Sequence, residues 1–167
     1  MKAASQQFHY FIAFLILSAL LVGANYLQVY MGINPCPLCI LQRITFGLLG
    51  IVFLLGIAFG FKRCVQMGIG SAGLLVSLLG IALSGRQVWL QHLPKNFDAN
   101  CDVSLNYMLK VLPLQDVIQK VFAGGTMCAQ VEWTFLHLSL AEWSLGWFIL
   151  FAIFCFVQLV MPAKAGI

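Results

Sequence analysis

Two cysteines separated by two residues form the most reactive motif in this sequence. Cys36 and Cys39 enclose Pro37 and Leu38. This spacing allows a tight, reversible disulfide, and a helix that follows it stabilises a thiolate through its unpaired N–H groups and its dipole. A c-type haem site would need His directly after Cys39, where Ile40 stands, and a structural zinc site would need a second ligand pair. A redox pair is therefore favoured over a metal site.

A second pair of cysteines, Cys101 and Cys128, has 26 residues between its members. Taken alone, the pair is best interpreted as a disulfide that closes a loop, which would add about 3.5 kcal/mol of stability by loop-closure entropy. If both pairs lie on one side of a membrane, however, they can form a relay in which each thiolate attacks the next sulfur. The presence of two pairs favours the relay over the loop-closing role.

The composition indicates an integral membrane protein. Of 167 residues, 62% are hydrophobic and 8% are charged, against roughly 25% charged in an average soluble domain. The formal net charge of +4 includes no basic cluster, which argues against binding to nucleic acid. Four apolar stretches are long enough, or nearly so, to cross a bilayer as helices. They are residues 8–27, 40–61, 65–83 and 143–160. We expect an all-α bundle of four transmembrane helices that forms a single membrane domain, residues 1–167.

The positive charges predict which way the spans face. The short segments outside the spans carry Lys2, Lys62, Arg63 and Lys164. These segments must share one side, and all five acidic residues lie in the long segment 84–142. By the positive-inside rule, we expect both termini to be cytoplasmic and the loops 28–39 and 84–142 to be external. Cleavage of the first span as a signal peptide is an alternative, and it would leave the other spans facing the same way.

The remaining cysteines, Cys64 and Cys155, lie at the cytoplasmic turn and in the inner half of the last span. We expect both to be reduced and inert, because a buried thiol behaves as a small hydrophobic group.

The long loop should contain a short amphipathic helix. Between residues 113 and 122, apolar residues recur at helical spacing, with polar residues on the other face. Pro113 suits the first turn, and Gly124 and Gly125 suit the end. The apolar stripe would lie either on the lipid interface or against the rim of the bundle.

Arg43 is the one formal charge inside an expected span. It follows Cys39 by four residues and so lies one helical turn deeper on the same face. A cation there would stabilise a thiolate on Cys39 and an electron-rich oxygen on an acceptor. The alternative is that Arg43 snorkels to the phosphates of the outer interface.

A disulfide that oxidises other proteins must pass on two electrons. The sequence has no Gly-rich dinucleotide fingerprint, no paired intramembrane His for haem and no Cys cluster for iron and sulfur. The acceptor expected for a small four-helix protein is therefore a lipid-soluble quinone that reaches Cys39 and Arg43 from the bilayer.

Several motifs together resemble the disulfide bond formation protein B (DsbB) family over nearly the whole chain. They are Pro35-Cys36-Pro37-Leu38-Cys39 with Arg43, Cys101-Asp102, Leu112-Pro113-Leu114, Val121-Phe122, Gly125, Cys128, Trp133 and Phe135. The stretch from Gly85 to His92 also resembles the family at the outer end of the third span. The segment between His92 and Cys101 is shorter than the family's, and Cys64 and Cys155 have no counterpart in its relay.

The resemblance implies a protein-dithiol:quinone oxidoreductase of the bacterial inner membrane. It would reoxidise a periplasmic DsbA-like thiol oxidase and reduce ubiquinone or menaquinone, with no metal. Cys101 would receive the partner's thiolate, Cys128 would exchange with Cys36, and Cys39 would face the quinone beside Arg43. His92 would lie near the quinone, or be an ordinary interfacial histidine. The rival functions are a non-catalytic tetraspan scaffold with a stapled outer loop, and a quinone reductase of the vitamin K epoxide reductase type.

Overall fold

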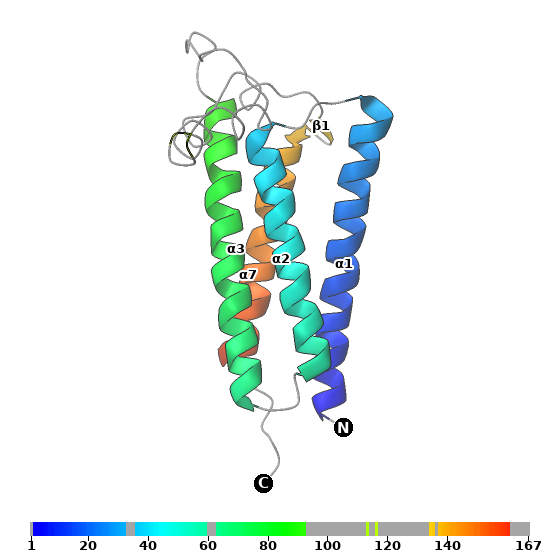
Figure 1. The fold of residues 1–167 in the computed structure, drawn as a ribbon, viewed down its shortest axis with the longest axis vertical. Helices are drawn as coiled ribbons and strands as arrows, with labels where there is room; N and C mark the ends of the chain where they lie inside the picture. Colours follow the sequence, from blue (N-terminus) through cyan, green and yellow to red (C-terminus); the bar gives the residue numbers. More distant parts are fainter. Residues whose placement is uncertain are drawn as a thin grey trace.

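Four long helices stand side by side in the structure, a computed structural model (Figure 1). The residues it describes are 2–32, 36–59, 63–92, 113, 116, 134–135 and 137–160. The helices are α1 (Lys2–Met31), α2 (Pro37–Phe59), α3 (Arg63–Gln91) and α7 (Leu140–Val160). Two short strands, β1 (Thr134–Phe135) and β2 (Leu138–Ser139), pair antiparallel before α7. Each of the four helices is long and apolar enough to span a membrane.

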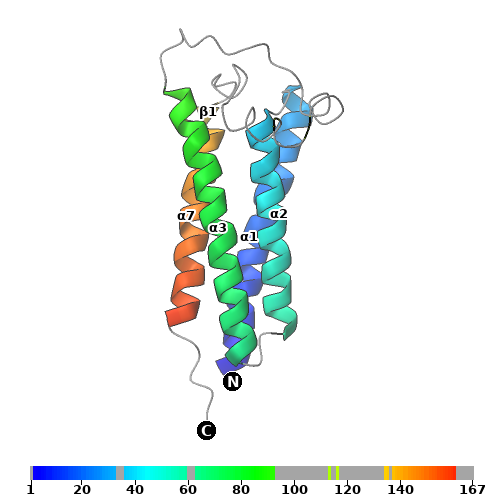
Figure 2. The same ribbon diagram turned by 60° about the vertical axis from the view of Figure 1, so that its left-hand side comes forward.

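Neighbouring helices in the chain run in opposite directions, as both views show (Figures 1 and 2). At one end of the bundle, α1 ends, α2 begins, α3 ends and α7 begins; because α2 begins beside the Cys36–Cys39 pair, we call this the cysteine end. At the other end, the far end, α1 begins and α7 finishes. The up-and-down arrangement therefore places the first and last described helical residues on the same side of the bundle.

The helices extend beyond the apolar stretches that predict them. The external loop was expected to begin at residue 84, but α3 continues to Gln91. Similarly, α2 begins at Pro37, so Cys39 lies in its first turn and not in the preceding loop, and α1 begins at Lys2, well before residue 8. The difference arises because polar residues mark where a chain meets the membrane interface, whereas a helix continues until a cap or a proline stops it.

The start of α7 shows such a cap. Ser139 Oγ accepts a hydrogen bond from the backbone N–H of Glu142 at 3.3 Å, and the Ser139 N–H donates to Glu142 Oε2 at 2.6 Å. This reciprocal capping box starts the helix at Leu140, three residues before the apolar stretch at 143. Ser139 Oγ also donates to Gln91 Oε1 at 2.8 Å, which fixes the end of α3 to the start of α7.

Small residues let α3 and α7 approach closely. Gly70, Gly73 and Gly80 face α7, and a Cβ added at any of them would lie 3.1 Å or less from an α7 side chain. A Cβ added at Gly73 would lie 2.7 Å from Cys155 Sγ, and one added at Gly80 would overlap the ring of Phe148. In a lipid environment, where packing and not the hydrophobic effect drives helix association, small residues of this kind are typical of helix interfaces.

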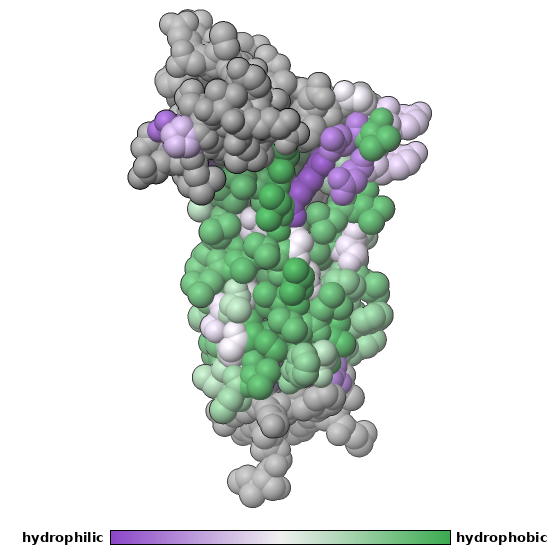
Figure 3. Space-filling model, in the orientation of Figure 1, coloured by the Kyte–Doolittle hydropathy of each residue, from purple (hydrophilic) through white to green (hydrophobic). Residues whose placement is uncertain are grey.

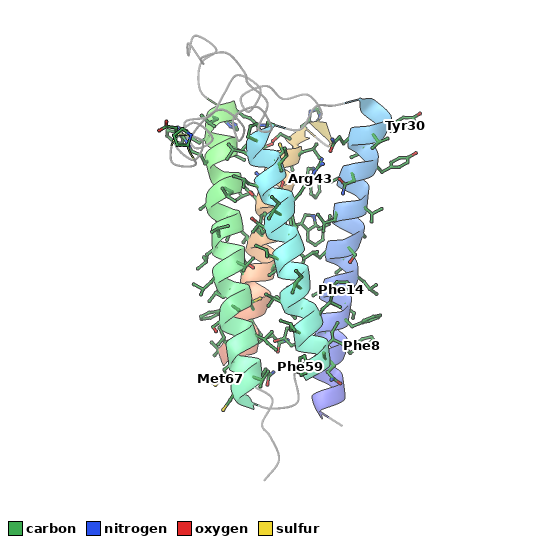
Figure 4. All side chains as sticks on the ribbon, viewed as in Figure 1. Phe8, Phe14, Tyr30, Arg43, Phe59 and Met67 are labelled. Atoms are coloured by element: carbon green, nitrogen blue, oxygen red, sulfur yellow. The ribbon has the colours of Figure 1, made fainter. Side chains whose placement is uncertain are left out.

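Aromatic side chains fill the centre of the bundle. Phe46 of α2 stacks on Phe148 of α7 with ring centroids 4.0 Å apart, and Tyr10 of α1 packs edge-on against Phe154 at 5.7 Å. Outward-facing side chains are also apolar, among them Phe8, Phe59 and Met67, labelled in Figure 4. The face seen in the space-filling view is accordingly hydrophobic over most of the helices, with hydrophilic atoms gathered toward the cysteine end over α1 and α2 (Figure 3). This distribution is that of a protein surrounded by lipid.

Most of the helix expected at 113–122 lies outside the described residues. The structure describes Pro113 and Asp116, both exposed, and the Asp116 N–H donates to the Pro113 carbonyl at 3.0 Å. Asp116 is itself in a helical conformation, and the rest of the amphipathic helix remains a prediction.

Candidate active site

Cys36 caps the N-terminus of α2 with its own sulfur. The backbone N–H of Cys39 donates to Cys36 Sγ at 3.3 Å, and the N–H of Ile40 donates to the Cys36 carbonyl at 3.1 Å. Pro37 occupies the first helical position, where its lack of an N–H costs nothing. The Cys-Pro-Leu-Cys sequence thus folds into a helix start in which sulfur takes the place usually held by an oxygen acceptor.

The two sulfurs of the pair lie 2.9 Å apart, and both residues are thiols in the structure. A disulfide needs about 2.05 Å between sulfurs, so a small movement would join them. Cys36 is 4% exposed, while Cys39 is partly exposed. The pair therefore has the geometry of a dithiol that can close reversibly, with Cys36 buried and Cys39 partly exposed.

Two glutamines, Gln42 and Gln87, lie next to the sulfurs, a pairing that the sequence pattern does not indicate. Gln87 Nε2 of α3 lies 3.1 Å from Cys39 Sγ and 3.6 Å from Cys36 Sγ. Gln42 Nε2 of α2 donates to Gln87 Oε1 at 2.7 Å. The signal that could have identified Gln42 was present, because an amide within an apolar span needs a partner. Gln87 was expected to lie in the loop, so its burial was not foreseen.

Arg43 lies between α2 and α1, as Figure 4 shows. Its guanidinium donates to Asn25 Oδ1 at 3.2 Å, to the Ala24 carbonyl at 3.3 Å and to Gln28 Oε1. All three acceptors belong to α1 and are electrically neutral. Arg43 therefore joins the two helices, keeps its charge at the cysteine end and remains within Coulombic range of Cys39.

His92 follows the last residue of α3 and is exposed. Its Nδ1 lies 2.9 Å from the carbonyl of Val88, one turn earlier on the same helix. This contact holds the imidazole against its own helix and not against the Cys36–Cys39 pair. The position of His92 near a quinone therefore remains a prediction.

Comparison with known proteins identifies the family. The model of the family described as disulfide bond formation protein DsbB matches residues 6–158. The chain belongs to the DsbB family. Three similar proteins carry the name disulfide bond formation protein B. One from Hahella chejuensis is 40% identical over 92% of this chain and 93% of its own. One from Pseudomonas aeruginosa, numbered 1, is 40% identical over 98% and 100%, and one from Psychrobacter arcticus is 44% identical over 81% and 76%.

Membership of the DsbB family defines the class of protein. The chain is a multi-pass, four-helix membrane protein and a disulfide-forming oxidoreductase. Within the described part of the chain, no group of three or more His, Cys, Asp or Glu side chains is placed to hold a metal ion.

The other four cysteines of this DsbB family member divide into two groups. Cys101 and Cys128 lie outside the described residues, so their pairing and their place in a relay stay predictions. Cys64 is exposed at the far end, and Cys155 is buried in the bundle with its sulfur against Gly73. Of the four described cysteines, Cys36 and Cys39 have polar donors directed at their sulfurs, Cys64 is exposed, and Cys155 is packed in the interior of the bundle.

Proposed function

We propose that the protein oxidises a periplasmic, DsbA-like dithiol oxidase and passes the electrons to a membrane quinone. It would act as a single membrane domain, residues 1–167, in the bacterial inner membrane with both termini cytoplasmic. The observation that carries the proposal is the Cys36–Cys39 dithiol at the end of a four-helix membrane bundle, with its sulfurs 2.9 Å apart and N–H donors directed at them.

The relay consists of three balanced exchanges. The partner's two thiols reduce the Cys101–Cys128 disulfide, and the partner leaves as a disulfide. The thiols of Cys101 and Cys128 then reduce the Cys36–Cys39 disulfide by the same attack of thiolate on sulfur. Finally, the Cys36–Cys39 dithiol closes to a disulfide while two electrons and two protons reduce the quinone to a quinol.

Arg43 fits the last step of this sequence. Its neutral partners on α1 hold the guanidinium without neutralising it, and such a donor favours the oxygen of an acceptor that gains electrons. Cys39 is the partly exposed member of the pair and lies one helical turn from Arg43. A quinone ring that approaches from the membrane would therefore contact both residues. His92, at the end of α3, would border the same region.

Anaerobic turnover tests the proposal. Purified protein is mixed with a reduced periplasmic thiol oxidase and a quinone, and quinone absorbance and partner thiols are followed together. We expect one quinone lost per partner disulfide formed, and none with Cys39→Ala. If thiols are not oxidised, or are oxidised without loss of quinone, the protein is a scaffold or uses another acceptor, and the proposal fails.

A further inference from the structure

The amides of Gln42 and Gln87 form an ordered chain that ends at the redox sulfurs. Both side chains are almost fully buried, at 5% and 4% exposure. A buried neutral amide costs free energy unless its hydrogen-bonding groups are satisfied. The Gln42 N–H occupies Gln87 Oε1, so the Nε2 group of Gln87 is directed toward Cys39 Sγ.

We propose that Gln87 is a further catalytic residue of this site, which stabilises the reduced Cys36–Cys39 pair and so makes its disulfide a stronger oxidant. Gln42 is the positioning residue that holds the Gln87 amide with its N–H toward sulfur. The inference rests on the proposed redox role of the Cys36–Cys39 pair, and it adds the groups that set the pair's reduction potential.

The direction of the effect follows from charge. Reduction of the disulfide takes up two electrons and one proton and yields one thiolate and one thiol, the electrons coming from the Cys101 and Cys128 thiols. A thiolate is a much stronger acceptor than the neutral sulfur of a disulfide, because hydrogen bonds to an ionised group are stronger. The Gln87 N–H therefore stabilises the reduced state more than the oxidised state, and a pair whose reduced form is stabilised oxidises others more strongly.

The observed orientation of the two amides suits a thiolate, whereas the opposite orientation would not. Were both amides turned over, Gln87 Oε1 would face the sulfurs and its lone pairs would repel a negative charge. Arg43 differs from Gln87 in this respect, since it acts by charge from the α1 side while the amide acts by a directed hydrogen bond from α3.

The reduction potential of the pair tests the proposal without quinone or partner. Cys101 and Cys128 are replaced by Ala in every sample, and the fraction of Cys36–Cys39 disulfide is measured by mass spectrometry after equilibration in dithiothreitol redox buffers. We expect Gln87→Leu to lower the equilibrium constant for reduction about tenfold, which is about 30 mV for a two-electron couple. Gln87→Glu, nearly identical in shape, should lower it further, because a carboxylate repels the thiolate.

Two further variants separate a direct hydrogen bond from general loosening of the cysteine end. Gln91→Leu removes an amide one turn further along α3 that bonds Ser139 and no described sulfur, and it should leave the constant within about twofold. Gln42→Leu should produce a smaller fall than Gln87→Leu, and the double variant should match Gln87→Leu alone, because Gln42 acts through Gln87.

Three results would overturn the inference. They are unchanged constants in both Gln87→Leu and Gln87→Glu, an equal fall in Gln91→Leu, and full additivity of the Gln42 and Gln87 changes. Failure of the wild-type pair to form a reversible disulfide would instead overturn the proposed function, so the two failures are distinguishable.

Discussion

The bundle contains two buried cysteines, Cys36 and Cys155, whose surroundings differ. Cys36, at 4% exposure, accepts hydrogen bonds from the Cys39 backbone and from Gln87. Cys155, at 1% exposure, lies against Gly73 near Tyr10, whose hydroxyl has no partner among the described residues. Burial is thus common to both sites, and the difference is the supply of N–H donors. The Cys36 site is organised by directed hydrogen bonds, whereas the Cys155 site is organised by close packing.

The sharpest test of this comparison replaces each sulfur in turn. Cys36→Ser should abolish quinone reduction, because serine cannot form the disulfide that carries the electrons. Cys155→Ala should retain turnover and cost about 1 kcal/mol of unfolding free energy from lost packing. Both variants are assayed for quinone loss and for unfolding in mixed detergent. Loss of turnover in a folded Cys155→Ala protein would show that the buried thiol takes part in electron transfer.

A smaller effect should follow from adding volume to the interface of α3 and α7. Gly80→Ala places a methyl group into the ring of Phe148 and should destabilise the bundle by about 2 kcal/mol. Gly85→Ala, on the same helix with nothing within 4 Å of the added carbon, is the matched control. It should be neutral or slightly stabilising, since alanine favours a helix over glycine. Equal unfolding free energies for the two variants would contradict close packing at Gly80.

The smallest expected effect concerns Arg43, at the cysteine end. Arg43→Gln should raise the apparent KM for quinone about tenfold, the loss of about 1.4 kcal/mol of binding from one charged donor. Oxidation of the partner by a preformed Cys101–Cys128 disulfide should stay unchanged, and Arg43→Lys should rescue only in part because it lacks the planar fork. The half-reactions are measured separately by stopped flow. Equal slowing of both half-reactions would indicate that Arg43 only fastens α1 to α2.

The sequence predicts the general architecture well because hydropathy reports contact with lipid directly. Four apolar stretches correspond to four helices, and the Cys36–Cys39 pair lies at the start of the second, as its position before the apolar stretch indicates. The ends of α3 and α7 were not predictable in this way. The end of α3 depends on the hydrogen bond between Gln91 and Ser139, which are 48 residues apart. The start of α7 depends on the capping box between Ser139 and Glu142, three residues apart.

The candidate site was predicted in its sulfurs but not in its donors. A Cys-x-x-Cys motif is recognisable by spacing alone, whereas the partner of a glutamine depends on which helices become neighbours. Gln42 and Gln87 are 45 residues apart and meet only after α2 and α3 pack. Arg43 was correctly placed one turn below Cys39, yet its hydrogen bonds go to α1, which no local pattern indicates.

The use of a sulfur as the cap of α2 links helix order to oxidation state. Cys36 Sγ accepts the N–H of Cys39, the residue with which it would form a disulfide. The negative charge of the reduced pair is shared by two sulfurs 2.9 Å apart and strengthens this acceptor, so bridging the sulfurs removes that charge and weakens the cap on the first turn of α2. By thermodynamic linkage, the free energy that this turn loses on oxidation is gained by the couple as oxidising strength. Fraying of one helical turn and the affinity of the pair for electrons are therefore two readouts of the same equilibrium.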